Sequence, residues 1–572
     1  MSTQKIIIFV LVCLMAAFAL LGWRVFYLQH CRADDYGLIS QRQRRSIIRE
    51  KPQRGMIVDR CGRIIAASSK TECVFVEPRA VADPEEAMQV ASRLQELLDM
   101  PAVEICDIIY GSKNPGFVKV KGQISPAERV AVEEARIGGV GILSSWERSY
   151  PMGALTSHVT GFTSVLDDSG VATGLAGVEL KYDPELRGIG SKDVFVVDVL
   201  RRPIGKKNGD GDGDSVGVDG LGVILTIDAT IQEFARAAIV RQVESYNAES
   251  GTVIVMDPWT GEILALVSVP DFAPDNFSKA SEKMLKNCAL TDPFEPGSIF
   301  KPIAAAIGLD AGAVGYNEKI YCEDGYYGKY RIGEFASHRF GNMTVKEILV
   351  KSSNIGMAKI GQKLGRQKLY DGVRRFGFGA RTGVDLPGED AGLFYPVSKW
   401  SGYSVTRIPF GHEISVTSLQ VIRAYAALAN GGSIVRPHLL RGLVDSSGEV
   451  RKLGPGKNLA GRIIDTKVAN WVVREALTGV VKDGTGKQAA IEGVEVFGKT
   501  GTANIAGVGG YDTTNYIASF AGGAPAGDPK VVILVSIRKP DRSLGKGYSG
   551  GRVAAQVFRE ILEKTLNYLE RE

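Results

Sequence analysis

The stretch EPGSIFKP, residues 295–302, carries the sharpest chemical signal in the sequence. Ser298 and Lys301 stand three positions apart, and Pro296-Gly297 before them predicts the start of a helix. Residues three apart on a helix share a face, so the hydroxyl and the amine are expected to be neighbours. A serine hydroxyl needs an adjacent base to act as a nucleophile, and a lysine held out of water can serve as that base. Taken alone, S-x-x-K is common by chance, and two solvated side chains would be the better explanation.

Two more motifs follow along the chain. Ser352-Ser353-Asn354 offers a hydroxyl and an amide that could relay a proton and hold a substrate amide, although alone it reads as a helix cap. The segment KTGT, residues 499–502, comes at the end of an apolar strand. Its lysine and hydroxyls suit an anionic carboxylate, and its glycine lets a substrate backbone approach, although alone K-T-G reads as a turn.

Together and in this order, the three motifs resemble the set of penicillin-binding proteins and serine β-lactamases. The resemblance covers nearly the whole chain, because PQRGMIVDRCGRIIAAS (52–68), WERSYPMGALTSHVTGF (146–162) and GLAGVELKYDPELRG (174–188) look like signatures of the class B pedestal domain. Ile65 and Gln556 depart from the usual leucine and proline of the family. The pedestal signatures occupy the space where class A members carry a glycosyltransferase domain, so the resemblance implies a monofunctional enzyme.

The resemblance implies an α+β chain in three parts. A membrane anchor is expected over residues 1–31, an α+β pedestal over 32–222 and a transpeptidase domain over 223–572, with an antiparallel sheet packed against helices. The pattern of the last part agrees, since apolar strands occur near residues 223–270 and again near 494–538. This arrangement predicts one sheet built from both ends of the domain, with a long helical region extending to about residue 380.

The implied reaction is cross-linking of peptidoglycan stem peptides. Ser298 attacks the penultimate carbonyl of a D-Ala-D-Ala end, Lys301 is the general base, and the backbone N–H groups of Ser298 and Thr502 form the oxyanion hole. The implied catalytic residues are Ser298, Lys301, Ser352, Asn354 and Lys499, and the implied substrate-binding residues are Thr500, Gly501 and Thr502. β-Lactam antibiotics should acylate the same serine.

The N-terminus predicts a membrane anchor. Ile6 to Trp23 is an uncharged run of 18 residues, which spans roughly 27 Å as a helix, close to a hydrocarbon core. The alternative is a cleaved signal peptide, but its candidate site, Ala17-Phe18-Ala19, lies inside the apolar run. We expect a single-pass protein of the cytoplasmic membrane with its catalytic domain outside. Lys5 before the run and Arg24 and Arg32 after it do not settle the orientation.

Composition excludes several other classes. The formal net charge of +5 is dilute over 572 residues and no basic stripe with aromatics is visible, so nucleic acid is not an expected partner. The seven cysteines form no CxxC pair, so no zinc site is expected, and neither a metal nor a cofactor is implied. The segment NGDGDGDSVGVDG, residues 208–220, partly resembles a calcium loop but has aspartate at position 12, which favours a flexible hairpin tip.

Several alternatives stay open at this stage. The pedestal and TGVDLPGEDAGL favour the division-type branch, with septal wall synthesis and with a membrane glycosyltransferase and division proteins as partners. An elongation-type role in cell shape is the runner-up. A membrane-bound β-lactam sensor or hydrolase on the same fold and a non-catalytic scaffold are the other hypotheses. The sequence leaves the acceptor amine open.

Overall fold

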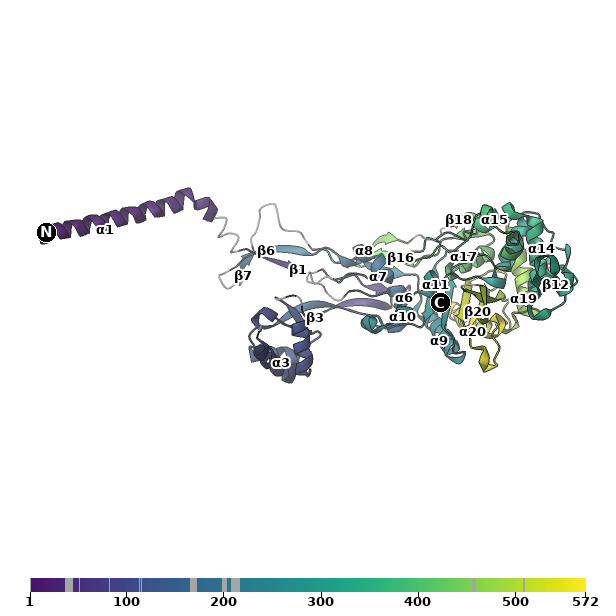
Figure 1. The fold of residues 1–572 in the computed structure, drawn as a ribbon, viewed down its shortest axis with the longest axis horizontal. Coiled ribbons are helices and arrows are strands. Elements are labelled where there is room, and N and C mark those ends of the chain that lie inside the picture. The colour runs from purple at the N-terminus through teal and green to yellow at the C-terminus, as the bar shows by residue number, and fades with distance from the viewer. Residues whose placement is uncertain are drawn as a thin grey trace. The chain divides into compact units, whose positions relative to one another are not determined.

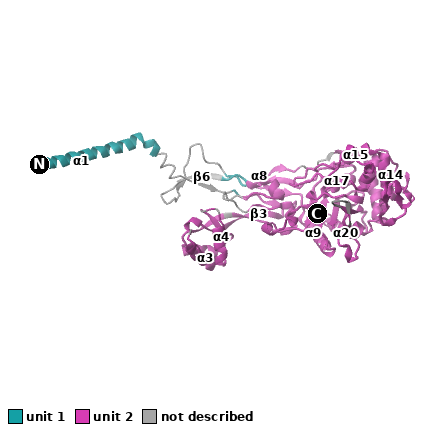
Figure 2. Cartoon of the chain, viewed as in Figure 1, with its two compact units in different colours: residues 1–52, 188–219 teal, residues 53–187, 220–572 magenta. Residues whose placement is uncertain are grey.

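The computed structural model describes residues 2–36, 45–50, 52–81, 83–112, 114, 116–164, 172–197, 203–206, 217–454, 459–507 and 510–571. The chain forms two compact units, residues 1–52 with 188–219, and residues 53–187 with 220–572 (Figure 2). Most of the loop for which a hairpin tip was predicted, residues 207–216, lies outside the described residues.

The first unit begins with an apolar helix. Helix α1 (Thr3–Phe26) continues into a π-helical turn, η1 (Tyr27–Cys31). The span Gln4–Cys31 has a mean hydropathy of 2.8 and is long and apolar enough to cross a membrane. It is the one such helix within the described ranges, and it fits a single-pass anchor. The unit also contains an antiparallel sheet of β1 (Arg45–Glu50), β6 (Ser191–Val197) and β7 (Pro203–Lys206).

In the second unit, one mixed sheet contains strands from both segments, residues 53–187 and residues 220–572. Its strands run in the order β17 (Val450–Leu453), β16 (Leu440–Val444), β8 (Gly222–Leu225), β2 (Ile57–Val58), β3 (Ile64–Val76) and β4 (Val118–Lys121), with β5 (Val140–Ser149) also paired to β3. A small subdomain between β3 and β5 has its own core, built by α3 (Pro84–Leu98), α4 (Ala102–Gly111) and α5 (Pro126–Ala135). Helix α3 turns Ala87, Val90 and Leu94 into this core, one helical turn apart.

Buried ion pairs explain the charged positions of the pedestal signatures. Arg54 bonds to both Glu179 and Asp183, and all three side chains are nearly inaccessible. Arg148 bonds to the other oxygen of Glu179. Removing one partner from such a set leaves an uncompensated buried charge, so these residues tie three distant signatures into one folding unit.

The sheet of the transpeptidase part confirms the prediction of one sheet built from both ends. Its order is β10 (Ile263–Val269), β9 (Ser250–Met256), β21 (Val531–Arg538), β20 (Gly510–Ala524) and β19 (Phe497–Gly507), all antiparallel. Successive strand residues point to opposite faces. Val253 and Val255 therefore join the core under α9 (Ala229–Ser245) and α20 (Gly550–Leu569), which lie side by side (Figure 1). Ile254 and Met256 join the core on the other face, with α17 (Ser418–Ala429).

The predicted long helical region is only partly right. Helices α12 (Lys301–Asp310), α13 (Val345–Lys351), α14 (Asn354–Leu364) and α15 (Arg366–Arg375) are present. Residues 319–344 instead form short strand pairs, β11 (Lys319–Tyr321) with β14 (Asn342–Thr344), and β12 (Tyr326–Tyr327) with β13 (Ile332–Gly333). Aromatic residues and glycines in this segment give no helical periodicity, and its backbone turns through left-handed positions at Arg331, Ala336 and Ser337.

Candidate active site

Ser298 lies in a 3-10 turn, η5 (Gly297–Phe300), which continues directly into α12. Ile299 and Phe300 are fully buried and anchor this turn, while Ser298 is partly exposed and lines a cleft. Pro302 stands in the first turn of α12, where its missing N–H costs nothing. The local sequence therefore presents the Ser298 hydroxyl at a helix start while its apolar neighbours fix the backbone.

Lys301 is fully buried beneath that serine. Its Nζ donates to Ser352 O at 2.6 Å, to Asn354 Oδ1 at 2.8 Å and to Ser352 Oγ at 3.2 Å. Burial lowers the pKa of Lys301 to about 7, and the negative charge of Glu334 acts in the opposite direction. A substantial fraction of the amine is therefore neutral near pH 7 and able to accept a proton.

Ser352 is the meeting point of two lysines. It ends α13 in a left-handed conformation, with a φ of 62°, which is costly for a residue other than glycine. Its Oγ lies 3.0 Å from Lys499 Nζ as well as 3.2 Å from Lys301 Nζ. Strained backbone of this kind is often found at functional sites, where the surrounding structure holds it in place.

Lys499 approaches from the edge strand β19 and is also fully buried. Its Nζ donates to Thr500 O at 3.1 Å and lies 3.3 Å from Thr500 Oγ1. The pKa of Lys499 is held well below its usual value, mainly by burial and to a smaller extent by the charge of Lys301. The two amines thus share one hydroxyl in a dry environment, which disfavours a positive charge on both at once.

The residues after Lys499 line the cleft in alternation. Thr500 and Thr502 face it, and the Thr500 and Thr485 hydroxyls lie 2.7 Å apart. Thr502 Oγ1 accepts the Gly550 N–H at 3.1 Å, where α20 begins. Gly501 also lies close to the nucleophile turn, because a Cβ there would lie 2.9 Å from Ile299 Cγ2 and 3.3 Å from Pro296 O. The glycine admits the turn that carries Ser298.

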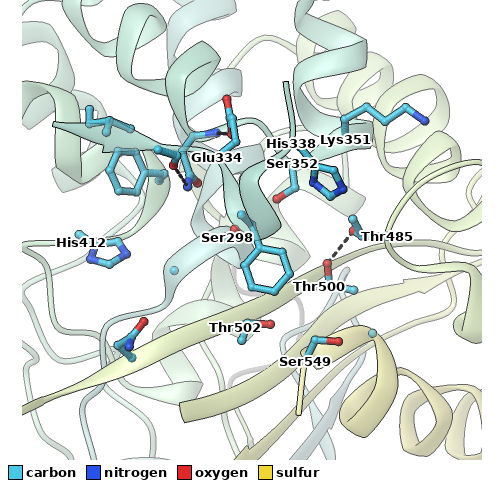
Figure 3. A pocket seen from close by; sticks show the side chains of 18 of the residues that line it. Ser298, Glu334, His338, Lys351, Ser352, His412, Thr485, Thr500, Thr502 and Ser549 are labelled. Atoms are coloured by element: carbon cyan, nitrogen blue, oxygen red, sulfur yellow. Dashed lines mark hydrogen bonds between the residues drawn. The ribbon is translucent and has the colours of Figure 1, made fainter. Parts of the chain in front are cut away.

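The cleft has a volume of about 320 Å³. Ser298 lies between the segment with Ser352 and the strand with Thr500 and Thr502, while His412 is seen on the side away from Ser352 (Figure 3). The structure thus brings all eight predicted site residues into one region, with Ser298, Ser352, Asn354, Thr500 and Thr502 on the surface of the cleft. Lys301 and Lys499 lie behind it, within hydrogen-bonding distance of Ser352.

Sequence reasoning missed Glu334, which directly follows β13 in the segment that replaces the expected helix. Its carboxylate accepts hydrogen bonds from Ser353 Oγ at 2.5 Å, Asn354 N at 2.7 Å and Ile355 N at 3.2 Å. It therefore caps the N-terminus of α14 together with Ser353, the N-cap residue. No local pattern in the sequence points to Glu334, because its partners lie about 20 residues further along the chain.

The chain resembles known proteins over its full length. The family model described as penicillin binding protein transpeptidase domain matches residues 251–563, and the penicillin-binding protein dimerisation domain matches residues 49–217. The probable peptidoglycan D,D-transpeptidase PenA of Neisseria meningitidis is 33% identical, covering 100% of this chain and 94% of that protein. The peptidoglycan D,D-transpeptidase FtsI of Escherichia coli is 31% identical, covering 96% and 89%.

A solved structure shares the fold. Penicillin binding protein 3 of Mycobacterium tuberculosis, in complex with ampicillin, has a TM-score of 0.69 and 26% identity, covering 91% of this chain and 96% of that one. A transpeptidase domain that follows a dimerisation domain is the arrangement expected from the pedestal signatures. The chain therefore belongs to the class B penicillin-binding proteins, the serine D,D-transpeptidases of peptidoglycan.

Proposed function

We propose that this enzyme cross-links stem peptides in the septal wall and that its active site works as follows. Ser298 Oγ attacks the penultimate carbonyl of a D-Ala-D-Ala end while Lys301 takes its proton. The bond to the terminal D-alanine breaks, and Ser352 passes a proton to the leaving amine. An amine from a second stem then attacks the ester on Ser298 to form the cross-link.

The observation that carries this proposal is that two buried lysines meet at Ser352 Oγ, and that Ser352 lines the same cleft as Ser298. A lysine with a pKa of about 7 can both accept and return a proton near neutral pH. Asn354, fixed on its other side by Gly333 O, orients Lys301 and faces the substrate amide. Thr500 and Thr502 offer hydroxyls to the terminal carboxylate, with the buried amine of Lys499 close to Thr500.

The proposal extends to inhibition by penicillin. Hydrolysis of the acyl-enzyme needs a base that activates water, which contributes a factor of roughly 10² to 10⁴. Among the described residues that line the cleft, Glu334 is the one carboxylate, and its oxygens already accept hydrogen bonds from α14. This arrangement favours a penicillin adduct that is long-lived. It disfavours the rapid loss of the adduct that a recovering sensor or a hydrolase requires.

We also propose an extracytoplasmic catalytic domain and the boundaries 1–31, 32–222 and 223–572 for anchor, pedestal and transpeptidase. The septal role, with a membrane glycosyltransferase and division proteins as partners, is supported by the likeness to FtsI. Depletion in the native cell should give filaments; round cells would favour the elongation role instead.

The biochemical test uses the purified full-length chain with a donor pentapeptide and an amine acceptor. Release of D-alanine with formation of the cross-linked product is the expected result. Acylation without any transfer product, at acceptor concentrations that support transfer by a known transpeptidase, would refute the transpeptidase assignment in favour of a sensor.

A further inference from the structure

A second cavity, of about 470 Å³, adjoins the catalytic cleft. Asn504 lines both spaces, and the segment 293–295 on its wall leads directly to Ser298. Tyr395, Trp400 and Ile414 give the second cavity an apolar wall. The roles proposed above for the donor peptide leave this space unused, although cross-linking requires a second substrate beside the same serine.

Two carboxylates line the second cavity next to each other. Glu295 Oε1 accepts the backbone N–H of Glu413 at 3.0 Å, which ties the two residues together. The Glu413 carboxylate also accepts the Ser404 hydroxyl, which fixes its direction. Two carboxylates with fixed positions therefore line the cavity close to the start of the turn that carries Ser298.

Glu413 occupies a costly conformation. Its φ is 59°, in the left-handed region where glycine is the favoured residue. Strained backbone of this kind is common at ligand-binding sites, and here it places a carboxylate on a cavity wall.

His412 lies next to Glu295 but does not offset the charge of that carboxylate. It lines the catalytic cleft, and its Nδ1 lies 3.3 Å from Glu295 Oε2. Burial, then the charges of Arg407 and Lys301, lower the pKa of His412 to about 4. A neutral imidazole at physiological pH does not cancel the charge of Glu295.

Two cationic side chains also line the second cavity. Lys399 and Arg538 line it, with the Lys399 ammonium 5.5 Å from the centre of the Tyr395 ring. Arg538 lies 3.9 Å from Glu249, a distance that leaves its guanidinium loosely held. Both signs of charge around an apolar wall match a zwitterionic amino-acid end with an aliphatic chain.

We propose that the second cavity is the subsite for the acceptor stem. Glu295 and Glu413 hold its primary ammonium, and Lys399 and Arg538 take a carboxylate next to that amine. The inference rests on the proposed transpeptidase function. After the ammonium loses one proton to solvent, its nitrogen bonds to the acyl carbon, the bond from that carbon to Ser298 Oγ breaks, and the second amine proton returns to Oγ.

The test measures partition of the acyl-enzyme in the purified full-length chain. A donor pentapeptide is supplied with D-norleucine, or with D-norleucinamide, which lacks the carboxylate, and mass spectrometry gives the ratio of aminolysis to hydrolysis. The wild type should prefer D-norleucine. Glu413→Gln should lower the aminolysis ratio with D-norleucine ~10-fold, as loss of a close charge pair does. Glu449→Gln, an exposed carboxylate on another hairpin, is the control and should leave the ratio unchanged.

Glu413→Gly separates binding from folding. Glycine relieves the left-handed backbone, so this variant should unfold at a higher temperature while losing aminolysis as Glu413→Gln does. An undiminished aminolysis ratio in both Glu413 variants, with active wild type, would overturn the subsite. Absence of any Ser298 acyl-enzyme in the wild type would overturn the proposed function itself.

Discussion

Replacing Glu334 by glutamine tests whether a residue outside the three motifs organises the active site. The carboxylate accepts hydrogen bonds from Ser353 Oγ and from the backbone N–H groups of Asn354 and Ile355. Asn354 Oδ1 in turn accepts from Lys301 Nζ. Glu334 is therefore a positioning residue, acting on Lys301 through Asn354 and through its charge.

The stability cost follows from the hydrogen bonds. Glutamine keeps one acceptor oxygen but turns an NH₂ group toward a buried donor. Leaving one buried donor unsatisfied and weakening charge-assisted bonds costs about 1–3 kcal/mol. We expect chemical denaturation to give a loss of unfolding free energy in that range.

The pH dependence has a defined direction. The charge of Glu334 raises the pKa of Lys301 against the effect of burial. Without that charge the pKa of Lys301 falls below about 7. Because Lys301 must be neutral to take the Ser298 proton, the rising limb of the acylation profile should move to lower pH.

The assay is the second-order rate of acylation by a fluorescent penicillin, measured across the neutral pH range. Glu323→Gln is a matched control, since Glu323 lies near the same strand pairs but forms a partly exposed ion pair with Lys359, a type of pair that contributes about 0–1 kcal/mol. If the rising limb of the acylation profile of Glu334→Gln stays in place or moves to higher pH, the electrostatic role of Glu334 is refuted.

Three other substitutions follow from the same geometry. The pKa of Lys301 is about 7 in the folded chain and 10.5 as the ordinary value. Between these values the unfolded chain binds one more proton than the folded chain, so wild-type stability should rise with pH. Lys301→Met should flatten this rise. Lys499→Ala removes the bond to Ser352 Oγ and should slow acylation ~10²-fold, whereas Lys482→Ala on an exposed surface should not. Gly501→Ala should cost about 1–3 kcal/mol of stability and slow acylation, because its Cβ would displace Ile299 beside Ser298; an unchanged thermal unfolding temperature would contradict this packing.

The sequence predicted the parts of the fold that local patterns encode. Short, nearly continuous apolar runs at both ends of the transpeptidase part indicated the strands, and the central sheet joins them as expected. The three motifs in this order resemble the set of the penicillin-binding proteins, and that resemblance implied which distant residues meet. The structure places Ser298, Lys301 and Ser352 accordingly.

Other features depend on contacts that no local pattern encodes. Glu334 follows a run of aromatic residues and glycines, and its importance comes from meeting the start of α14. The close approach of Ile299 to Gly501 is a further tertiary contact, which the KTG motif does not encode. The burial of Lys499 likewise follows from tertiary packing rather than from the KTG motif.

The central claim is that Ser298 is the acylated nucleophile, and mass spectrometry of the purified chain after a brief penicillin pulse tests it most directly. We expect one penicillin adduct, mapped to Ser298, that persists for minutes to hours. The one carboxylate among the described residues of the cleft, Glu334, is hydrogen-bonded to α14 rather than placed to activate water, and a positioned base contributes a factor of roughly 10² to 10⁴. Ser298→Ala should show no adduct and an unfolding profile close to that of the wild type. An adduct on the alanine variant, or its loss within seconds with repeated turnover of the drug, would contradict the account.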